Sequence, residues 1–172
     1  RKMYAYHFNG YWKDVGTISS LWEANMEVLD PEHSGINLFD NNWKIYSRNS
    51  GMTGHKISAS ADVHDSMITD GCRIRGTVKH SVLFAGVKVA EGAVVEDAVV
   101  MGGTTIERGA VVRHCIIAEN VTIKENAVVG AMPEGDEHGV ATVGSGITIG
   151  EGAVIGPKAM VRNNVEGGEE QW

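Results

Sequence analysis

The chain of 172 residues is poor in cysteine, in positive charge and in long apolar runs. Cys72 and Cys115 are too few for a disulfide framework. Fifteen Lys and Arg against 22 Asp and Glu give a formal net charge of -7, which argues against a nucleic-acid or anionic-membrane partner because both would repel it. No apolar run approaches the ~18 residues of a membrane-spanning helix, and no signal-peptide pattern is present. We therefore expect a soluble, cytoplasmic protein that binds anions only through local cations or Mg²⁺.

Aromatic residues are few and unevenly placed. Nine of the 11 lie before residue 47, whereas 19 of the 22 glycines lie after residue 50. Such a break predicts two structural parts, which we place at 1–50 and 51–172. Because the chain opens with Arg1-Lys2 rather than Met, we expect it to be a piece of a longer protein.

Internal repetition is what the chain has in abundance. When residues 87–129 are written in rows of 17, Gly92 falls over Gly109, and branched aliphatic residues form columns such as Val94/Val111/Val128, Val95/Val112/Val129 and Val89/Ile106/Ile123. A short fixed period of this kind predicts a parallel β-helix, in which each coil buries its apolar face only against its neighbours. We expect the β-helix over about 57–165, with a bulge at 70–77, where the register blurs, and an excursion loop at 131–142.

Polar residues that lie 17 positions apart provide an independent test of the stacking. Stacked strands lie ~4.8 Å apart, so these residues become neighbours. Charge alternates down each column, as favourable cross-strand pairs require. The columns are Lys79–Glu96–Arg113, Glu91–Arg108–Glu125 and His80–Asp97–His114.

The histidine column allows three interpretations. Some hexapeptide β-helices bind zinc through histidines, and others are acyltransferases with a single histidine as base. Two coils separate His80 from His114, a distance of roughly 9.6 Å, so both cannot ligate one zinc ion without a second subunit. We therefore favour a solvated ladder of turn residues in which Asp97 bridges the two imidazoles.

The segment 1–50 reads as a strand, a helix and a linker. Aromatic content predicts a strand at 3–8. Thr17 is the expected N-cap of the helix, Ser20 and Glu23 have capping-box spacing, and Asp30-Pro31 is the expected end. The expected apolar face comprises Ile18, Trp22, Met26 and Leu29. Two extended pieces, 36–39 and 43–46, are expected in the linker 32–50. This apolar surface should pack on the flank of the β-helix or on a domain outside the chain.

Two motifs resemble one enzyme family. YWKDVGT (11–17), followed by Trp22-Glu-Ala-Asn25, is similar to the end of the catalytic domain of bacterial glucose-1-phosphate adenylyltransferase, also called ADP-glucose pyrophosphorylase. Ser-Val-Leu-Phe (81–84), within 71–89, is similar to the first β-helix coils of that family. The family implies a left-handed β-helix, a cytoplasmic homotetramer, allosteric regulation, and AMP transfer from ATP to glucose 1-phosphate in glycogen synthesis.

The resemblance also implies roles for two residues. Asp14 matches the aspartate that helps to hold the catalytic Mg²⁺, and Trp12 matches the tryptophan beside the glucose 1-phosphate pocket. Without the resemblance, Asp14 reads as an Asx-turn or a surface charge near a helix N-terminus. The family's Gly-rich phosphate loop is missing, so we expect this chain alone to be inactive and to bind no cofactor. Where some members carry an effector-binding Arg after Ser-Val-Leu-Phe, this chain has Ala85-Gly86, with Lys88 the nearest cation.

Two other functions are compatible with the repeat. One is a hexapeptide acyltransferase, which leaves the aromatic segment 3–30 unexplained. The other is a non-catalytic regulatory or oligomerisation module. Only Asp14 and its neighbours favour the adenylyltransferase interpretation over this module.

Overall fold

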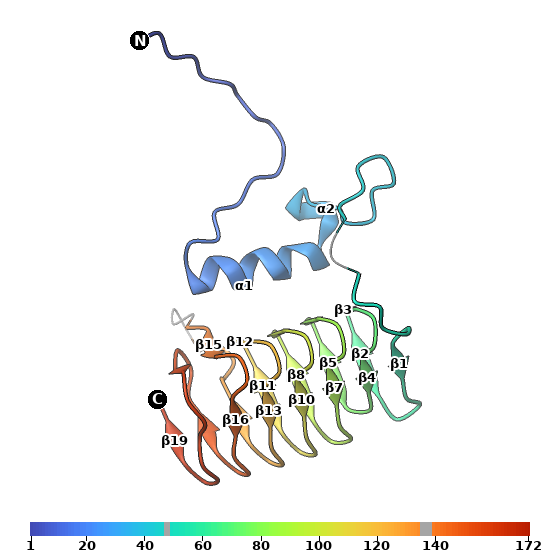
Figure 1. The fold of residues 1–172 in the computed structure, drawn as a ribbon, viewed down its shortest axis with the longest axis vertical. Coiled ribbons are helices and arrows are strands. Elements are labelled where there is room, and N and C mark those ends of the chain that lie inside the picture. Colours follow the sequence, from blue (N-terminus) through green and yellow to red (C-terminus); the bar gives the residue numbers. More distant parts are fainter. Residues whose placement is uncertain (47–48, 135–138) are drawn as a thin grey trace.

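The chain forms a short helical part followed by a parallel β-solenoid in the computed structural model (Figure 1). The structure describes residues 1–46, 49–134 and 139–172. None of the helices in these ranges has the length and apolar character needed to cross a membrane. The boundary that we place at residue 50 stays a prediction.

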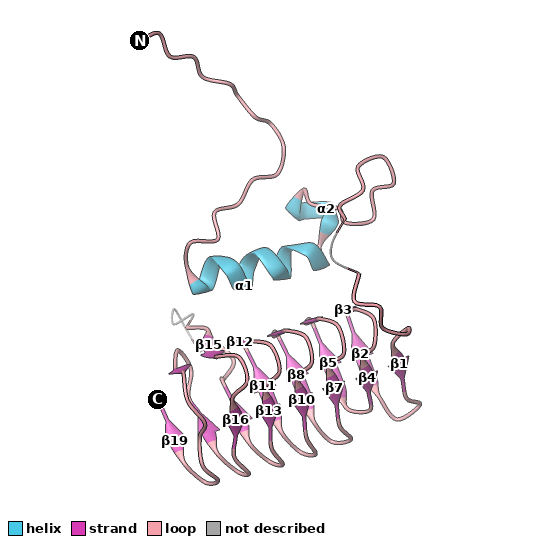
Figure 2. Ribbon diagram, in the orientation of Figure 1, coloured by secondary structure: helices cyan, strands magenta, loops and turns pink. Residues whose placement is uncertain are grey.

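Three parallel sheets make the sides of the solenoid, and Figure 2 shows their short strands stacked along its length. The first sheet contains β1 (Lys56–Ile57), β4 (Arg73–Ile74), β7 (Lys88–Val89), β10 (Thr105–Ile106), β13 (Thr122–Ile123) and β16 (Thr148–Ile149). The second contains β2 (Asp62–His64), β5 (Thr77–Lys79), β8 (Val94–Glu96), β11 (Val111–Arg113), β14 (Val128–Val129), β17 (Val154–Ile155) and β19 (Glu170–Gln171). The third contains β3 (Met67–Ile68), β6 (Val82–Leu83), β9 (Val99–Val100), β12 (Cys115–Ile117), β15 (Ala141–Val143) and β18 (Met160–Val161). The predicted parallel β-helix is confirmed, and its left hand stays a prediction.

The register follows the predicted period through the middle of the solenoid. Val94 pairs with Val111, and Val111 pairs with Val128. Inward-facing residues such as Val95, Val112 and Cys115 are fully buried. The charged columns also lie in register, since Lys79 pairs with Glu96 and Glu96 with Arg113. Arg113 Nε donates to Glu96 Oε2 at 3.1 Å, and Arg108 lies 3.8 Å from Glu91. The inward and outward assignment of the repeat is therefore confirmed.

The bulge predicted at 70–77 is wrong, because this coil is shortened. Val63 pairs with Val78, and Val78 pairs with Val95. The chain from Val63 to Val78 therefore completes one coil with fewer residues than the chain from Val78 to Val95. The difference lies at the corner between β4 and β5, which contains fewer residues than the equivalent corner between β7 and β8. Gly76 permits the shorter path. A Cβ atom at Gly76 would collide with the carbonyl oxygens of Ala90 and Ala93, so a larger residue would not fit against the next coil.

The excursion loop lengthens one coil at the position predicted. Val128 pairs with Val154, whereas Val111 pairs with Val128, so the later coil contains the additional residues. The strand β15 begins at Ala141, so the loop ends before our predicted boundary at 142. Residues 135–138 of the predicted loop lie outside the described residues.

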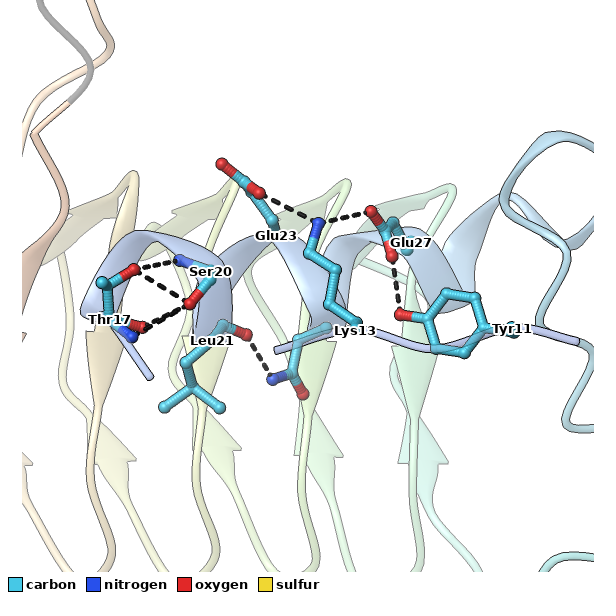
Figure 3. Close-up of polar contacts among 8 residues, drawn as sticks. Tyr11, Lys13, Thr17, Ser20, Leu21, Glu23 and Glu27 are labelled. Carbon is cyan, nitrogen blue, oxygen red and sulfur yellow. Dashed lines mark hydrogen bonds and ion pairs between the residues drawn. The ribbon is translucent and has the colours of Figure 1, made fainter. Parts of the chain in front are cut away.

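The helix begins at the predicted N-cap. Thr17 precedes α1 (Ile18–Met26), which continues as the 3₁₀ turn η1 (Glu27–Leu29). The capping box joins Thr17 to Ser20 rather than Ser20 to Glu23. Thr17 Oγ1 accepts a hydrogen bond from Ser20 N at 3.1 Å, and Ser20 Oγ accepts one from Thr17 N at 3.0 Å (Figure 3). The turn ends before Pro31 as predicted, but Pro31 opens the short α2 (Pro31–Ser34) because its fixed φ suits a first helical position.

The strand predicted at 3–8 is wrong. Met3, Tyr4 and Tyr6 are at least 90% exposed, and the segment has no strand beside it in the described part of the chain. Residues 36–39 and 43–46 likewise form turns and irregular structure. Aromatic residues favour strands only where a neighbouring strand supplies hydrogen bonds and a surface to cover.

The helical part packs on the outer face of the third sheet, which confirms one of the two partners that we expected. α1 runs along the solenoid beside this sheet (Figure 1). Met26 is buried in a cluster with Val82, Val99 and Ile116, together with Leu21, Trp22 and Leu29 from the helical part. Ile18, which we expected on this face, is 38% exposed instead. Because α1 covers the third sheet, β6 and β9 are buried on both faces.

Candidate functional site

The segment before α1 runs back along the helix and is tied to it by polar contacts. Tyr11 Oη donates to Glu27 Oε2 at 2.6 Å. Lys13 Nζ donates to Glu27 Oε1 at 2.7 Å and to Glu23 Oε2 at 3.0 Å (Figure 3). These contacts fix the approach of the chain to its N-cap.

Charge within this cluster is stabilised by the same contacts. The hydrogen bonds from Lys13 and Tyr11 lower the pKa of Glu27, and the hydrogen bonds to Glu27 and Glu23 raise the pKa of Lys13. Partial burial, followed by the hydrogen bond to Glu27, raises the pKa of Tyr11. At neutral pH the cluster therefore holds a cationic Lys13 against an ionised Glu27.

Trp12 and Asp14, the predicted site residues, alternate with the two that contact α1. Successive side chains of an extended segment point to opposite sides. Trp12 is 76% exposed, and Asp14 is also exposed. The structure therefore presents both side chains away from α1, on the face that a further domain could approach.

Asp14 makes a local turn. Its Oδ1 accepts a hydrogen bond from Gly16 N at 3.0 Å, which confirms the Asx-turn as its local structure. The described residues contain no cluster of three or more His, Cys, Asp or Glu able to hold a metal ion. A single exposed carboxylate fits a Mg²⁺ site of the kind that takes one or two carboxylates and completes its shell with phosphate oxygens and water. Among the described residues Asp14 is thus the candidate ligand, and the other ligands would have to come from substrate, water or another domain.

The histidine column is not fully exposed to solvent, as the ladder that we predicted would be. Asp97 Oδ1 lies 2.5 Å from His80 Nδ1, as the ladder requires. His114, however, is only 5% exposed, and its ring packs against Trp22 of α1 with centroids 4.5 Å apart. Trp22 Nε1 also donates to the backbone oxygen of Asp97 at 2.7 Å. The column is therefore a docking point for α1, and His114 is covered where an acyltransferase base would have to reach substrate.

A column of cations on the first sheet escaped the sequence analysis. Lys56 pairs with Arg73, and Arg73 pairs with Lys88, so three positive charges occupy neighbouring strands. Arg75 lies just beyond Arg73 along the chain, and these four residues, which we call the basic column, line two shallow hollows of about 470 and 360 Å³. Because the shortened coil separates Arg73 from Lys88, an alignment in rows of 17 does not reveal their pairing.

The cysteines offer no reactive thiol. Both are buried and free, and burial raises the pKa of each thiol. Cys115 faces the interior of the solenoid and is fully buried. A thiolate nucleophile or metal ligand would need the opposite shift.

Comparison with known proteins agrees with this architecture. Residues 51–150 match the family model described as GlmU-like, C-terminal hexapeptide, and residues 1–31 match that of nucleotidyl transferases. Glucose-1-phosphate adenylyltransferase of Geobacillus stearothermophilus is 52% identical over 96 residues, which are 56% of this chain and 24% of the relative. The enzymes of that name from Bacillus mycoides and Bacillus cereus are each 55% identical over 98 residues, 57% of this chain and 26% of theirs. The matched region thus spans about a quarter of these relatives. Because the hexapeptide model matches more than half of the chain, this chain belongs to the GlmU-like C-terminal hexapeptide family.

Proposed function

We propose that this chain is the C-terminal part of a glucose-1-phosphate adenylyltransferase, which makes ADP-glucose and pyrophosphate from ATP and glucose 1-phosphate in glycogen synthesis. The observation that carries the proposal is the YWKDVGT segment, held on α1 with Trp12 and Asp14 pointing outward. Its place within the nucleotidyl transferase match at 1–31 supports the same function. Adenylyltransferases named for this reaction are similar to the chain over more than half of its length.

Asp14 would supply one carboxylate to Mg²⁺, and Trp12 would lie beside the bound glucose 1-phosphate. When bound, the metal would neutralise charge that develops as the α-phosphate is attacked and pyrophosphate leaves. Asp14 would hold its carboxylate in a fixed place because Gly16 N binds one of its oxygens and the N-cap follows directly. The Gly-rich phosphate loop and lysines of the catalytic domain are not in this sequence, so these two residues would not suffice for activity.

Pyrophosphate release tests the proposal directly. With ATP, glucose 1-phosphate and Mg²⁺, the full-length gene product should release pyrophosphate, and the isolated 172-residue chain should release none. A coupled phosphate assay on both proteins at equal concentration makes the comparison, with omission of glucose 1-phosphate as the blank. A folded full-length protein without activity would contradict the proposal and favour a regulatory subunit.

The solenoid itself would serve assembly and regulation of a cytoplasmic homotetramer. Open coil ends and a flat sheet are surfaces on which subunits can pair. The basic column gathers four cations in a chain of net charge -7, and like charges on adjacent strands are unfavourable unless an anion offsets them. A phosphorylated effector is the kind of ligand that this column fits. Free buried thiols are consistent with a reducing cytoplasm.

Inorganic phosphate is a simple probe of the basic column. In the full-length enzyme, phosphate should change the rate at subsaturating substrate, and Arg73→Ala should weaken the apparent phosphate affinity about tenfold by removing a charge-assisted hydrogen bond. Arg162→Ala, which removes an exposed arginine outside the column, is the matched control. An identical phosphate response in wild type and Arg73→Ala would remove the basic column from regulation.

A further inference from the structure

We infer that Trp22, seated on the Asp97–His114 corner of the solenoid, is a positioning residue that sets where the segment 11–17 presents Trp12 and Asp14. The inference rests on the proposed function, since it assigns those two residues to the active site. It concerns the contact of Trp22 with the Asp97–His114 corner, which neither motif nor periodicity predicts.

The first half of the joint ties the site segment to α1. Tyr11 and Lys13 contact Glu23 and Glu27 on the helix, and the capping box of Thr17 fixes the turn between them (Figure 3). Hydrogen bonds at both ends of so short a segment leave it little freedom to move against the helix. Displacement of α1 would therefore displace Asp14 with it.

The second half ties α1 to the solenoid. Most of that interface is apolar, through residues such as Met26 and Leu21 against Val99. Apolar contacts are non-directional, so they resist separation more than sliding. Trp22 adds a directional contact, because its Nε1–H donates to the Asp97 carbonyl at 2.7 Å while its ring packs on His114. This residue therefore fixes the position of α1 along the solenoid.

The acceptor that Trp22 uses is itself held firmly. Asp97 occupies the corner between β8 and β9 with φ of 50°, a left-handed conformation that is uncommon for a residue other than glycine. Its backbone N–H donates to the carbonyl of Lys79 at 3.1 Å, and its carboxylate contacts His80 of the preceding coil. His114 N donates to the carbonyl of Glu96 at 3.1 Å, which fixes the coil that follows. Trp22 thus contacts a preorganised site built from three successive coils.

The decisive experiment replaces Trp22 with Phe in the full-length gene product. The variant keeps an aromatic ring on His114 and removes the indole N–H. We expect kcat to fall about tenfold, since misplacement of a catalytic group by a fraction of an ångström slows the chemical step. The KM for ATP should change by less than about twofold, because the proposed function assigns no ATP-binding residue to α1 or to the solenoid corner that the variant alters. Met26→Leu, a buried apolar change in the same interface without a hydrogen bond, is the matched control and should leave kcat unchanged.

A second variant addresses the acceptor and keeps the test decisive if Trp22→Phe fails to fold. Asp97→Gly suits the left-handed corner and retains the carbonyl, but it removes the carboxylate that contacts His80. Its kcat should also fall, by less than that of Trp22→Phe. An active wild type together with an unchanged kcat in either folded variant would overturn the inference alone. A parallel loss of kcat and melting temperature in Met26→Leu would also overturn it, by showing that any loosening of the interface suffices. A wild type that releases no pyrophosphate would instead contradict the proposed function.

Discussion

Replacement of Val95 by Asp is expected to unfold the β-solenoid. Val95 is fully buried at the centre of β8, between Val78 and Val112 on the neighbouring strands. A carboxylate there would be surrounded by aliphatic side chains, which cannot offset its desolvation. The free energy of unfolding should drop by more than about 4 kcal/mol, which exceeds what most single substitutions cost. Val112→Asp, one coil further on, should do the same.

Circular dichroism during thermal unfolding is the measurement for this prediction. Val111→Asp is the matched control. It places the same charge on the outward position next to Val112, where the side chain reaches solvent. The control should lower the free energy of unfolding by about 1 kcal/mol or less, the scale of strand propensity. A Val95→Asp protein with β-type circular dichroism and a normal melting temperature would show that the inward and outward faces have been interchanged.

The solenoid was predictable because its core residues recur in the sequence with the period of the coil. Each coil repeats the same packing problem, so Val95 and Val112 recur at the spacing that stacking imposes. Charge alternation at Glu96 and Arg113 reports the same register independently. The shortened coil escaped prediction because a single residue, Gly76, marks the shorter corner in the sequence. Glycine is needed there because the carbonyl oxygens of the next coil leave no room for a Cβ atom.

The docking of α1 was only partly predictable. The helix pattern identified Trp22 and Met26 as apolar, but not the surface that they cover. That surface had a signal of its own, because the outward positions of the third sheet are apolar at Met67, Val82, Val99 and Ile116, whereas the first sheet carries Arg, Lys or Thr at its outward positions. The burial of His114 follows from α1 and not from its own column, so the column alone suggested a solvated ladder.

In the candidate site, likewise, local features were predictable from the sequence and long-range contacts were not. Thr17 was predictable as an N-cap because capping depends on neighbours in sequence. The contacts of Tyr11 and Lys13 with Glu27 join residues 16 and 14 positions apart, and no periodicity marks them. The strand expected at 3–8 was wrong because aromatic content does not by itself supply a neighbouring strand, and none of the described strands lies beside this segment.

Asp14→Asn in the full-length gene product should lower the maximal rate far more than it lowers stability. Asn keeps an oxygen that can accept from Gly16 N, so the Asx-turn and the N-cap of α1 should persist. It removes the negative charge that a divalent cation requires of its ligand. Loss of one preorganised electrostatic contact at a reacting centre typically costs about 100-fold or more in kcat. The melting temperature should change by less than about 2 °C, since an exposed polar substitution shifts stability only slightly.

Asp40→Asn separates the catalytic effect from the turn. Asp40 Oδ1 accepts a hydrogen bond from Asn42 N at 2.8 Å, the same local geometry as that of Asp14, in a part of the chain that the site does not use. Its kcat should match that of the wild type. Raising the Mg²⁺ concentration adds a second criterion, because a weakened metal ligand shifts the concentration for half-maximal activity upward, whereas a damaged turn does not. Should Asp14→Asn retain the wild-type rate and the wild-type Mg²⁺ dependence, Asp14 would be a turn residue only, and the outward face of the segment 11–17 would owe its chemistry to Trp12 alone.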